Sequence, residues 1–180
     1  EAERQMSKMA RDGIEWVHEE VRGIDPLTRE VHTETQTLRG DYIVVALGAG
    51  PDPGAVPGFT GSAHNLYEAS GAFQLKRALS EFDGGRIVVL VSRVPYRCPA
   101  APYEAAFLMD SMLREKEIRR RVDIAIYTPG KRPMAVAGPA IGDALVGMLA
   151  EREIAYRGDH VVSSIDPVSR KILFGDDEVA

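Results

Sequence analysis

Two largely apolar runs, each followed by a helical pattern, limit what this chain can fold into. Residues 86–92 and 123–128 are apolar along most of their length, which is typical of strands buried on both faces of a parallel sheet. Amphipathic helical patterns follow them over 102–116 and 138–151. Because a strand–helix–strand–helix order places parallel strands side by side with crossover helices between them, the sequence predicts an α/β fold.

The rest of the chain predicts shorter extended segments and two further helices. Residues 41–47 form a third apolar run, again typical of a buried strand, and a loop rich in glycine and proline follows it. The other predicted elements are a polar helix over 1–12, strands over 14–21 and 30–37, an amphipathic helix over 66–82, an extended segment over 154–165 and its hairpin partner over 171–174.

Two parts of the chain resemble each other. Each has an Ile-Asp-Pro turn between two extended runs, at Ile24–Pro26 and at Ile165–Pro167, and each follows a predicted helix. A chance likeness of two hairpins is the alternative, but the joint match of helix, strand, turn and strand favours a duplicated domain. We therefore expect part of one Rossmann-like domain, with a parallel sheet, crossover helices and a β-hairpin, followed by most of a second.

Composition excludes some classes of function and leaves others open. The chain has 22 lysine and arginine residues against 27 acidic ones, so no basic footprint for nucleic acid is present. The longest basic run, Arg119–Arg121, is expected to be a solvated helix end. The single cysteine cannot form an internal disulfide, and no apolar run approaches the length of a membrane span.

The single cysteine, Cys98, stands in a proline-rich stretch between a predicted strand and a predicted helix. The start of that helix and the nearby Arg93 and Arg97 bring positive charge, which favours the reactive, ionised form of a cysteine. The alternative is a buried cysteine that acts as a small apolar residue. Glu104, in the first turn of the helix, is interpreted as compensating the helix dipole.

Several segments together resemble one family of flavoproteins. Asp41-Tyr-Ile-Val-Val-Ala-Leu-Gly-Ala49 and the following Val56-Pro-Gly58 are similar to the edge of the FAD site in the pyridine nucleotide–disulfide oxidoreductases. The block Cys98-Pro-Ala-Ala-Pro-Tyr-Glu104 resembles sulfide:quinone oxidoreductases and flavocytochrome c sulfide dehydrogenases within that superfamily. Further matching segments are Gly85–Val89, Thr128–Pro129, Pro133–Gly138 and Gly175–Asp176.

The resemblance implies an FAD-dependent oxidoreductase in which Cys98 is the catalytic cysteine. It implies a small-molecule sulfur substrate, a persulfide or disulfide on the cysteine, and electron transfer through FAD to a quinone or to the haem of a cytochrome. The residues that it places at the cofactor are Ala46, Gly48, Ala49 and Pro99. It also implies a partner cysteine toward the C-terminus of the full protein, outside these 180 residues.

The resemblance further implies a division of the chain. Residues 1–60 are expected to be the C-terminal part of an FAD-binding domain, 61–84 a linker helix, and 85–180 a second domain like the NAD domain of the superfamily. Because position 1 is Glu and 177–180 look like the beginning of a strand, we expect an internal fragment, inactive and poor at binding FAD by itself. The implied location is cytoplasmic, periplasmic, or peripheral to a membrane through residues beyond this chain.

Two departures from the relatives keep alternatives open. Sulfide:quinone enzymes often carry a further cysteine near the position of Leu66 and Tyr67, where this chain has none. NAD(P)-binding relatives carry a glycine turn after the strand at 87–91, whereas this chain has prolines, which remove N–H donors. A persulfide or other thiol substrate, an NAD(P)H:acceptor oxidoreductase and a non-catalytic binding module are the alternatives.

Overall fold

The computed structural model describes residues 13–175 and 177–179 of the chain. The chain divides into two compact units, Glu1–Gly50 and Pro51–Ala180, and each is described by itself. The helix predicted over 1–12 lies outside the described residues. The division predicted at residues 60 and 84 stays a prediction about the whole protein.

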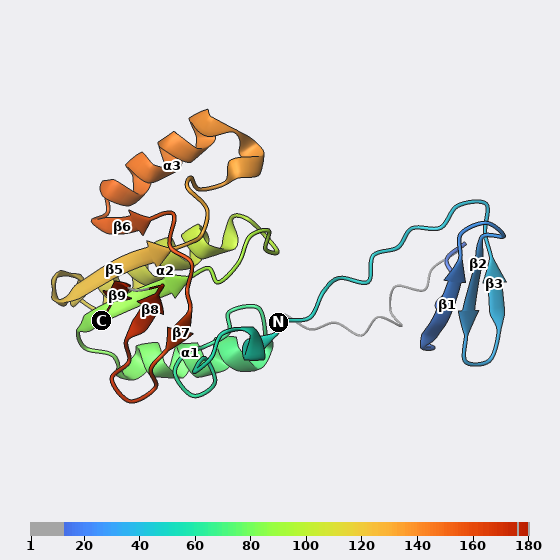
Figure 1. Ribbon diagram of the computed structural model, residues 1–180, viewed down its shortest axis with the longest axis horizontal. Coiled ribbons are helices and arrows are strands. Elements are labelled where there is room, and N and C mark those ends of the chain that lie inside the picture. Colours follow the sequence, from blue (N-terminus) through green and yellow to red (C-terminus); the bar gives the residue numbers. More distant parts are fainter. Residues whose placement is uncertain (1–12, 176, 180) are drawn as a thin grey trace. The chain divides into compact units, whose positions relative to one another are not determined.

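The first unit is a three-stranded antiparallel sheet in the order β1-β2-β3 (Figure 1). Its strands are β1 Val21–Asp25, β2 Glu30–Thr33 and β3 Thr37–Arg39. The carboxylate of Asp25 accepts the backbone N–H groups of Leu27 and Thr28 at 2.8 and 3.1 Å. An aspartate that bonds the backbone two and three residues ahead fixes a tight turn, and here it joins β1 to β2.

A carboxylate from outside the strands closes the second turn of this sheet. Glu19 accepts hydrogen bonds from the hydroxyls of Thr33 and Thr35 and from the side-chain amide of Gln36. These bonds, the one from Thr33 first, lower the pKa of Glu19 to about 2, because they favour the charged carboxylate. Glu19 therefore fastens the turn between β2 and β3.

The strand predictions for this unit were wrong in part. Residues 14–20 carry no strand, and a turn over 34–36 divides the predicted strand 30–37 into β2 and the beginning of β3. The apolar run 41–47 is not a strand, and the side chain of Tyr42 is 92% exposed. A strand needs hydrogen-bonding neighbours, and the described residues place none beside this run.

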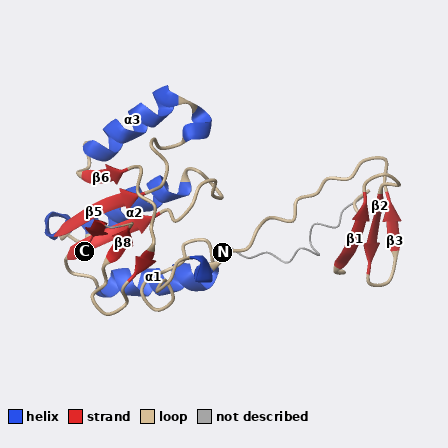
Figure 2. Ribbon diagram, in the orientation of Figure 1, coloured by secondary structure: helices blue, strands red, loops and turns tan. Residues whose placement is uncertain are grey.

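The second unit contains the predicted parallel sheet, in the order β4-β5-β6, and Figure 2 labels its strands β5 and β6. Its strands are β4 Gly85–Leu90, β5 Val122–Tyr127 and β6 Ile154–Arg157, and the helices are α1 Ala69–Glu81, α2 Ala101–Glu115 and α3 Pro139–Ala150. Short 3-10 helices occur at Pro53–Ala55, Arg119–Arg121 and Ala135–Ala137. Because α2 and α3 connect successive parallel strands, the predicted α/β fold with crossover helices is confirmed.

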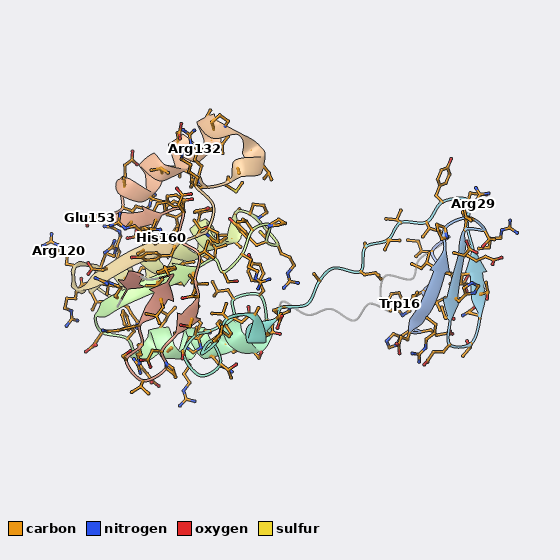
Figure 3. All side chains as sticks on the ribbon, in the orientation of Figure 1. Trp16, Arg29, Arg120, Arg132, Glu153 and His160 are labelled. Carbon is orange, nitrogen blue, oxygen red and sulfur yellow. The ribbon has the colours of Figure 1, made fainter. Side chains whose placement is uncertain are left out.

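The parallel sheet lies between a helical layer and a second, antiparallel sheet. On one face, side chains of the parallel strands pack against the helices; this core includes Val89, Ala106, Met109, Leu113, Ile124, Ile126 and Leu149. On the other face Ala125 and Tyr127 pack against Phe174, and His160 (Figure 3) lies edge-on to both rings at 5.2 Å. Burial on both faces explains why these strands are apolar along their length.

The antiparallel sheet of the second unit repeats the design of the first unit. Its strands are β7 Ser164–Ile165, β8 Ile172–Phe174 and β9 Asp177–Val179, in that order. Asp166 accepts the backbone N–H groups of Val168 and Ser169, as Asp25 does in the first sheet. Arg29 (Figure 3) and Arg170, four residues after these aspartates, both have φ of 58°. The two Ile-Asp-Pro segments thus fold alike, as expected of a duplicated domain.

A buried ion pair between Asp110 and Arg119 connects α2 with the beginning of β5 and with the segment that follows α3. Asp110 on α2 is 2% exposed and accepts a hydrogen bond from Nε of Arg119 at 2.6 Å. The rest of the Arg119 guanidinium donates to the carbonyls of Val122, Arg152 and Glu153, at 2.7, 2.8 and 3.0 Å. The prediction of a solvated helix end was therefore wrong for Arg119, because carbonyls at the ends of β5 and α3 need its donors.

Gly58, in the Val-Pro-Gly segment, allows the backbone of the second unit to pack closely on β7. Its φ is +79°, and a Cβ atom there would stand 1.7 Å from the carbonyl oxygen of Ile165. Beside it, the N–H of Ile165 donates to the carbonyl of Pro57 at 2.9 Å. Only glycine combines this backbone conformation with this approach.

Gly58→Ala is therefore expected to destabilise the second unit by more than the roughly 1–3 kcal/mol that a left-handed alanine costs alone. Gly61→Ala is the matched control, because Gly61 has φ of +85° and a Cβ there would meet nothing within 4 Å. Urea unfolding followed by circular dichroism measures both free energies of unfolding. Equal losses for the two variants would contradict the contact with Ile165.

Candidate functional site

Cys98 lies in the segment between β4 and α2, residues 91–100, called here the Cys98 turn. The side chain of Cys98 is exposed, so the alternative of a buried structural cysteine was wrong. Its φ is 48°, a left-handed conformation that costs a residue with a side chain about 1–3 kcal/mol. Such a conformation persists where surrounding contacts impose it, and the carbonyl of Cys98 accepts the N–H of Ala101 at 3.0 Å.

Two tyrosine hydroxyls hold the backbone on either side of Cys98. Tyr67 donates to the carbonyl of Arg97 at 2.6 Å, and Tyr96 donates to the carbonyl of Pro99 at 3.3 Å. The guanidinium carbon of Arg97 stands 5.1 Å from the centre of the Tyr67 ring, within range of a cation–π interaction. Tyr67 thus anchors the Arg97–Cys98 peptide group, and Tyr96 anchors the peptide group that follows Pro99.

A row of tyrosines extends from the Cys98 turn into the core. The ring centres of Tyr103 and Tyr156 lie 6.4 Å apart, and Tyr156 donates to the carbonyl of Gly130 at 2.9 Å. Burial is the main cause that raises the pKa of the Tyr96, Tyr103 and Tyr156 phenols, to about 12 for Tyr156. These hydroxyls therefore stay protonated at neutral pH and remain able to donate.

The backbone N–H groups at the start of α2 are already bonded. Ala101 donates to Cys98, Tyr103 and Glu104 both donate to Ala100 at 3.1 and 3.0 Å, and Pro102 has no N–H. A helix start binds phosphate through free N–H groups and its positive dipole. Here the described geometry offers no free donor in the first turn, and the carboxylate of Glu104 lies in that turn.

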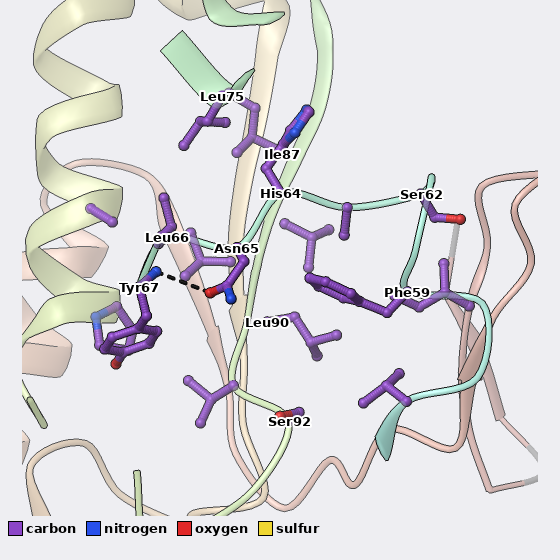
Figure 4. Close-up of a pocket in the computed structure, with 18 of the residues that line it drawn as sticks. Phe59, Ser62, His64, Asn65, Leu66, Tyr67, Leu75, Ile87, Leu90 and Ser92 are labelled. Atoms are coloured by element: carbon purple, nitrogen blue, oxygen red, sulfur yellow. Dashed lines mark hydrogen bonds between the residues drawn. The ribbon is translucent and has the colours of Figure 1, made fainter. Parts of the chain in front are cut away.

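A largely apolar groove of about 760 Å³ runs along β4 beside the Cys98 turn (Figure 4). All residues from Arg86 to Ser92 line it, together with side chains of α1 and of the segment 51–67. Tyr96 of the Cys98 turn belongs to the same lining, as do Tyr67 and Pro102. Within the described part of the chain, β4 pairs with β5 alone, so the groove follows the unpaired edge of the sheet.

The predicted cofactor residues fall into both units. Ala46, Gly48 and Ala49 lie in an exposed, extended part of the first unit. Gly48 has φ of +70°, and a Cβ there would meet nothing within 4 Å, so the small side chains leave room for a flat ring to approach. Half-buried Pro99 lies beside Cys98 in the second unit, and all these assignments stay predictions.

Sequence patterns did not identify Tyr67 as a site residue, and no local signal marks it. It stands thirty positions before the Arg97 carbonyl that it contacts. Among the described residues, no three His, Cys, Asp or Glu side chains cluster as a metal site would require. The helices described here are all too short or too polar to cross a membrane.

The middle of the chain matches a known protein family. Residues 73–132 match the sequence model of the central part of the "Sulfide dehydrogenase [flavocytochrome c] flavoprotein chain". The matched range contains β4, the whole Cys98 turn, α2 and β5.

Solved structures show the same fold. A sulfide:quinone oxidoreductase from the hyperthermophilic bacterium Aquifex aeolicus is similar over 91% of this chain and 40% of its own length, with a TM-score of 0.69 and 23% identity. A ferredoxin reductase from Rhodopseudomonas palustris is similar over 98% of this chain and 41% of its own, with a TM-score of 0.61 and 14% identity. A water-forming NADH oxidase from Lactobacillus brevis, bound to NADH, covers 89% and 34%, with a TM-score of 0.55 and 17% identity. The chain thus spans less than half the length of these relatives.

Proposed function

We propose that this chain is part of an FAD-dependent enzyme that oxidises a small sulfur compound through Cys98. Two findings support the proposal: the chain has the fold of the FAD-dependent pyridine nucleotide–disulfide oxidoreductases, and residues 73–132 match the family model of a sulfide dehydrogenase. The family resemblance predicted from the sequence is confirmed by these matches. The observation that carries the proposal is the exposed thiol of Cys98, held in a left-handed turn between β4 and α2.

The proposed chemistry is an exchange of sulfur bonds followed by electron transfer. Hydrogen sulfide attacks a disulfide between Cys98 and a second cysteine outside these 180 residues, so one S–S bond forms as another breaks. One cysteine then carries a persulfide and the other leaves as a thiolate. A second sulfide then takes the outer sulfur of the persulfide and leaves as a disulfide, which returns both cysteines as thiolates. Bound FAD would supply the two-electron acceptor that allows these thiolates to re-form their disulfide, with a quinone or a cytochrome as the final acceptor. The chain's own contribution is to present the thiol and to exclude nucleotide from the turn.

A second candidate, an NAD(P)H:acceptor oxidoreductase, has the support of the NADH-bound Lactobacillus brevis neighbour. The start of α2 counts against it, because its N–H groups are bonded within the chain or missing at Pro102. Sulfide oxidation is therefore the function that the geometry favours.

The test uses the full-length product of the gene, purified with its flavin under anaerobic conditions. We expect sulfide to bleach the visible absorbance of the flavin within seconds to minutes, and NADH and NADPH to leave it unchanged. Dithionite, which reduces flavins directly, shows in each sample that the flavin is competent. Bleaching by NADH without bleaching by sulfide would replace the proposal with the second candidate.

A further inference from the structure

One of the two hydroxyls that hold the Cys98 turn comes from another part of the second unit. Tyr96 belongs to the turn itself, whereas Tyr67 precedes α1 and reaches the Arg97 carbonyl at 2.6 Å. That carbonyl is part of the peptide group that leads into Cys98. Tyr67 therefore acts on the backbone at the point where the chain enters its left-handed residue.

Tyr67 is itself fixed at both ends. Its backbone N–H donates to the side-chain oxygen of Asn65 at 3.0 Å, as the dashed line in Figure 4 shows. Its ring lies against the guanidinium of Arg97, with 5.1 Å from the guanidinium carbon to the ring centre. Burial, and next to it the charge of a Cys98 thiolate, raise the pKa of the Tyr67 phenol. The hydroxyl therefore keeps its proton and continues to donate when the cysteine ionises.

We propose that Tyr67 is a positioning residue for Cys98, whose hydroxyl fixes the Arg97–Cys98 peptide and so keeps the thiol in the exposed conformation that a small sulfur substrate can reach. The positioning of Cys98 by Tyr67 follows from the contacts described above. Its effect on the rate of sulfur oxidation rests on the proposed function. Without the hydroxyl, the turn is free to leave the left-handed conformation, because that conformation is unfavourable for any residue with a side chain.

The first experiment needs neither flavin nor sulfide. In the 180-residue chain, whose folding is first verified by circular dichroism, Cys98 is the single cysteine, so a thiol-specific nitroxide labels this site alone, and its electron paramagnetic resonance spectrum reports the mobility of the turn. Tyr67→Phe is expected to increase that mobility, since it keeps the ring and removes the donor. Replacing Tyr67 by 4-aminophenylalanine, whose amino group can donate, is expected to restore the wild-type spectrum. Tyr42→Phe is the matched control, because Tyr42 is 92% exposed.

The second experiment measures the reaction in the full-length gene product. Tyr67→Phe is expected to lower the kcat of sulfide-dependent flavin reduction about fivefold, the usual effect of one hydrogen bond, with KM unchanged. The 4-aminophenylalanine variant is expected to recover most of that rate. Thermal unfolding of each variant, followed by circular dichroism, checks that the fold is intact.

The two experiments separate the inference from the function on which it draws. An unchanged spectrum for labelled Tyr67→Phe would overturn the inference, whatever the enzyme does with sulfide. A more mobile label together with a wild-type kcat would overturn it as well, because the position would then not matter for the reaction. Failure of the wild-type flavin to react with sulfide would overturn the proposed function, while the spectrum still decides whether Tyr67 holds the turn.

Discussion

Asp110→Ala is expected to lower the free energy of unfolding of the second unit by about 3–5 kcal/mol. Asp110 is 2% exposed and stands between two guanidiniums, with Nε of Arg119 at 2.6 Å and Nε of Arg114 at 2.9 Å. Removing the carboxylate leaves the buried charge of Arg119 without its counter-ion, which costs more than a surface pair ever contributes. Urea unfolding followed by circular dichroism measures the loss.

Asp143→Ala is the matched control for this change. Asp143 also lies on a helix and also faces an arginine, with Arg132 at 3.3 Å, but its side chain is 65% exposed. An exposed pair of this kind contributes about 1 kcal/mol or less. If both variants lost the same free energy of unfolding, the burial of Asp110 would make no contribution to stability.

The pH dependence of stability offers a check on the same ion pair. Burial acts to raise the pKa of Asp110, but the hydrogen bonds and charges of Arg114 and Arg119 outweigh it and the pKa is lowered. A lowered pKa means that the pair stabilises the fold fully above the pKa of an unfolded aspartate, about 3.9, and that this contribution is lost as pH falls through the folded value. The difference between wild type and Asp110→Ala is therefore expected to shrink below about pH 4.

Cys98→Ser is expected to abolish flavin reduction by sulfide in the full-length gene product, with a loss on the order of a thousandfold or more. Serine keeps the size of the side chain, so the left-handed turn and its contacts with Tyr67 and Tyr96 persist. Its hydroxyl is un-ionised at neutral pH and forms no disulfide or persulfide. Stopped-flow absorbance of the flavin after anaerobic mixing with sulfide measures the rate.

Dithionite serves as the control for Cys98→Ser, because it reduces the flavin without the cysteine. We expect equal rates with dithionite in the variant and the wild type. A serine variant that still reacts with sulfide within tenfold of the wild-type rate would remove Cys98 from the mechanism.

The parallel sheet was predictable because its signal is local. Strand β5 is largely buried, and β4 contributes side chains to the apolar clusters on both faces of the sheet, so both strands are largely apolar in the sequence. The same signal misled at residues 41–47, where an apolar run has no hydrogen-bonding neighbour in the described part of the chain. Apolar sequence indicates a strand, but pairing decides whether it forms.

Of the candidate site, the sequence predicted Cys98 but not the residues that hold it in place. A lone cysteine between prolines, before a helix start, singled out Cys98 without any tertiary information. The residue that holds the turn, Tyr67, could not be found this way, since its contact with Arg97 joins segments that only the fold brings together. Arg119 was misjudged for the same reason, because the carbonyls of Arg152 and Glu153 that it contacts lie 33 and 34 positions away in the sequence.

The hydrogen-bonded backbone amides at the start of α2 affect which cellular metabolites can bind beside the Cys98 turn. Cells hold large pools of dinucleotides and nucleoside triphosphates, and any helix start with free N–H groups is open to competition from all of them. The backbone N–H groups of Ala101, Tyr103 and Glu104 are not free to bind a phosphate, because each donates to a carbonyl of the same chain. Under the proposed function, a nucleotide phosphate would therefore find no free N–H donor in the helix turn that follows the thiol.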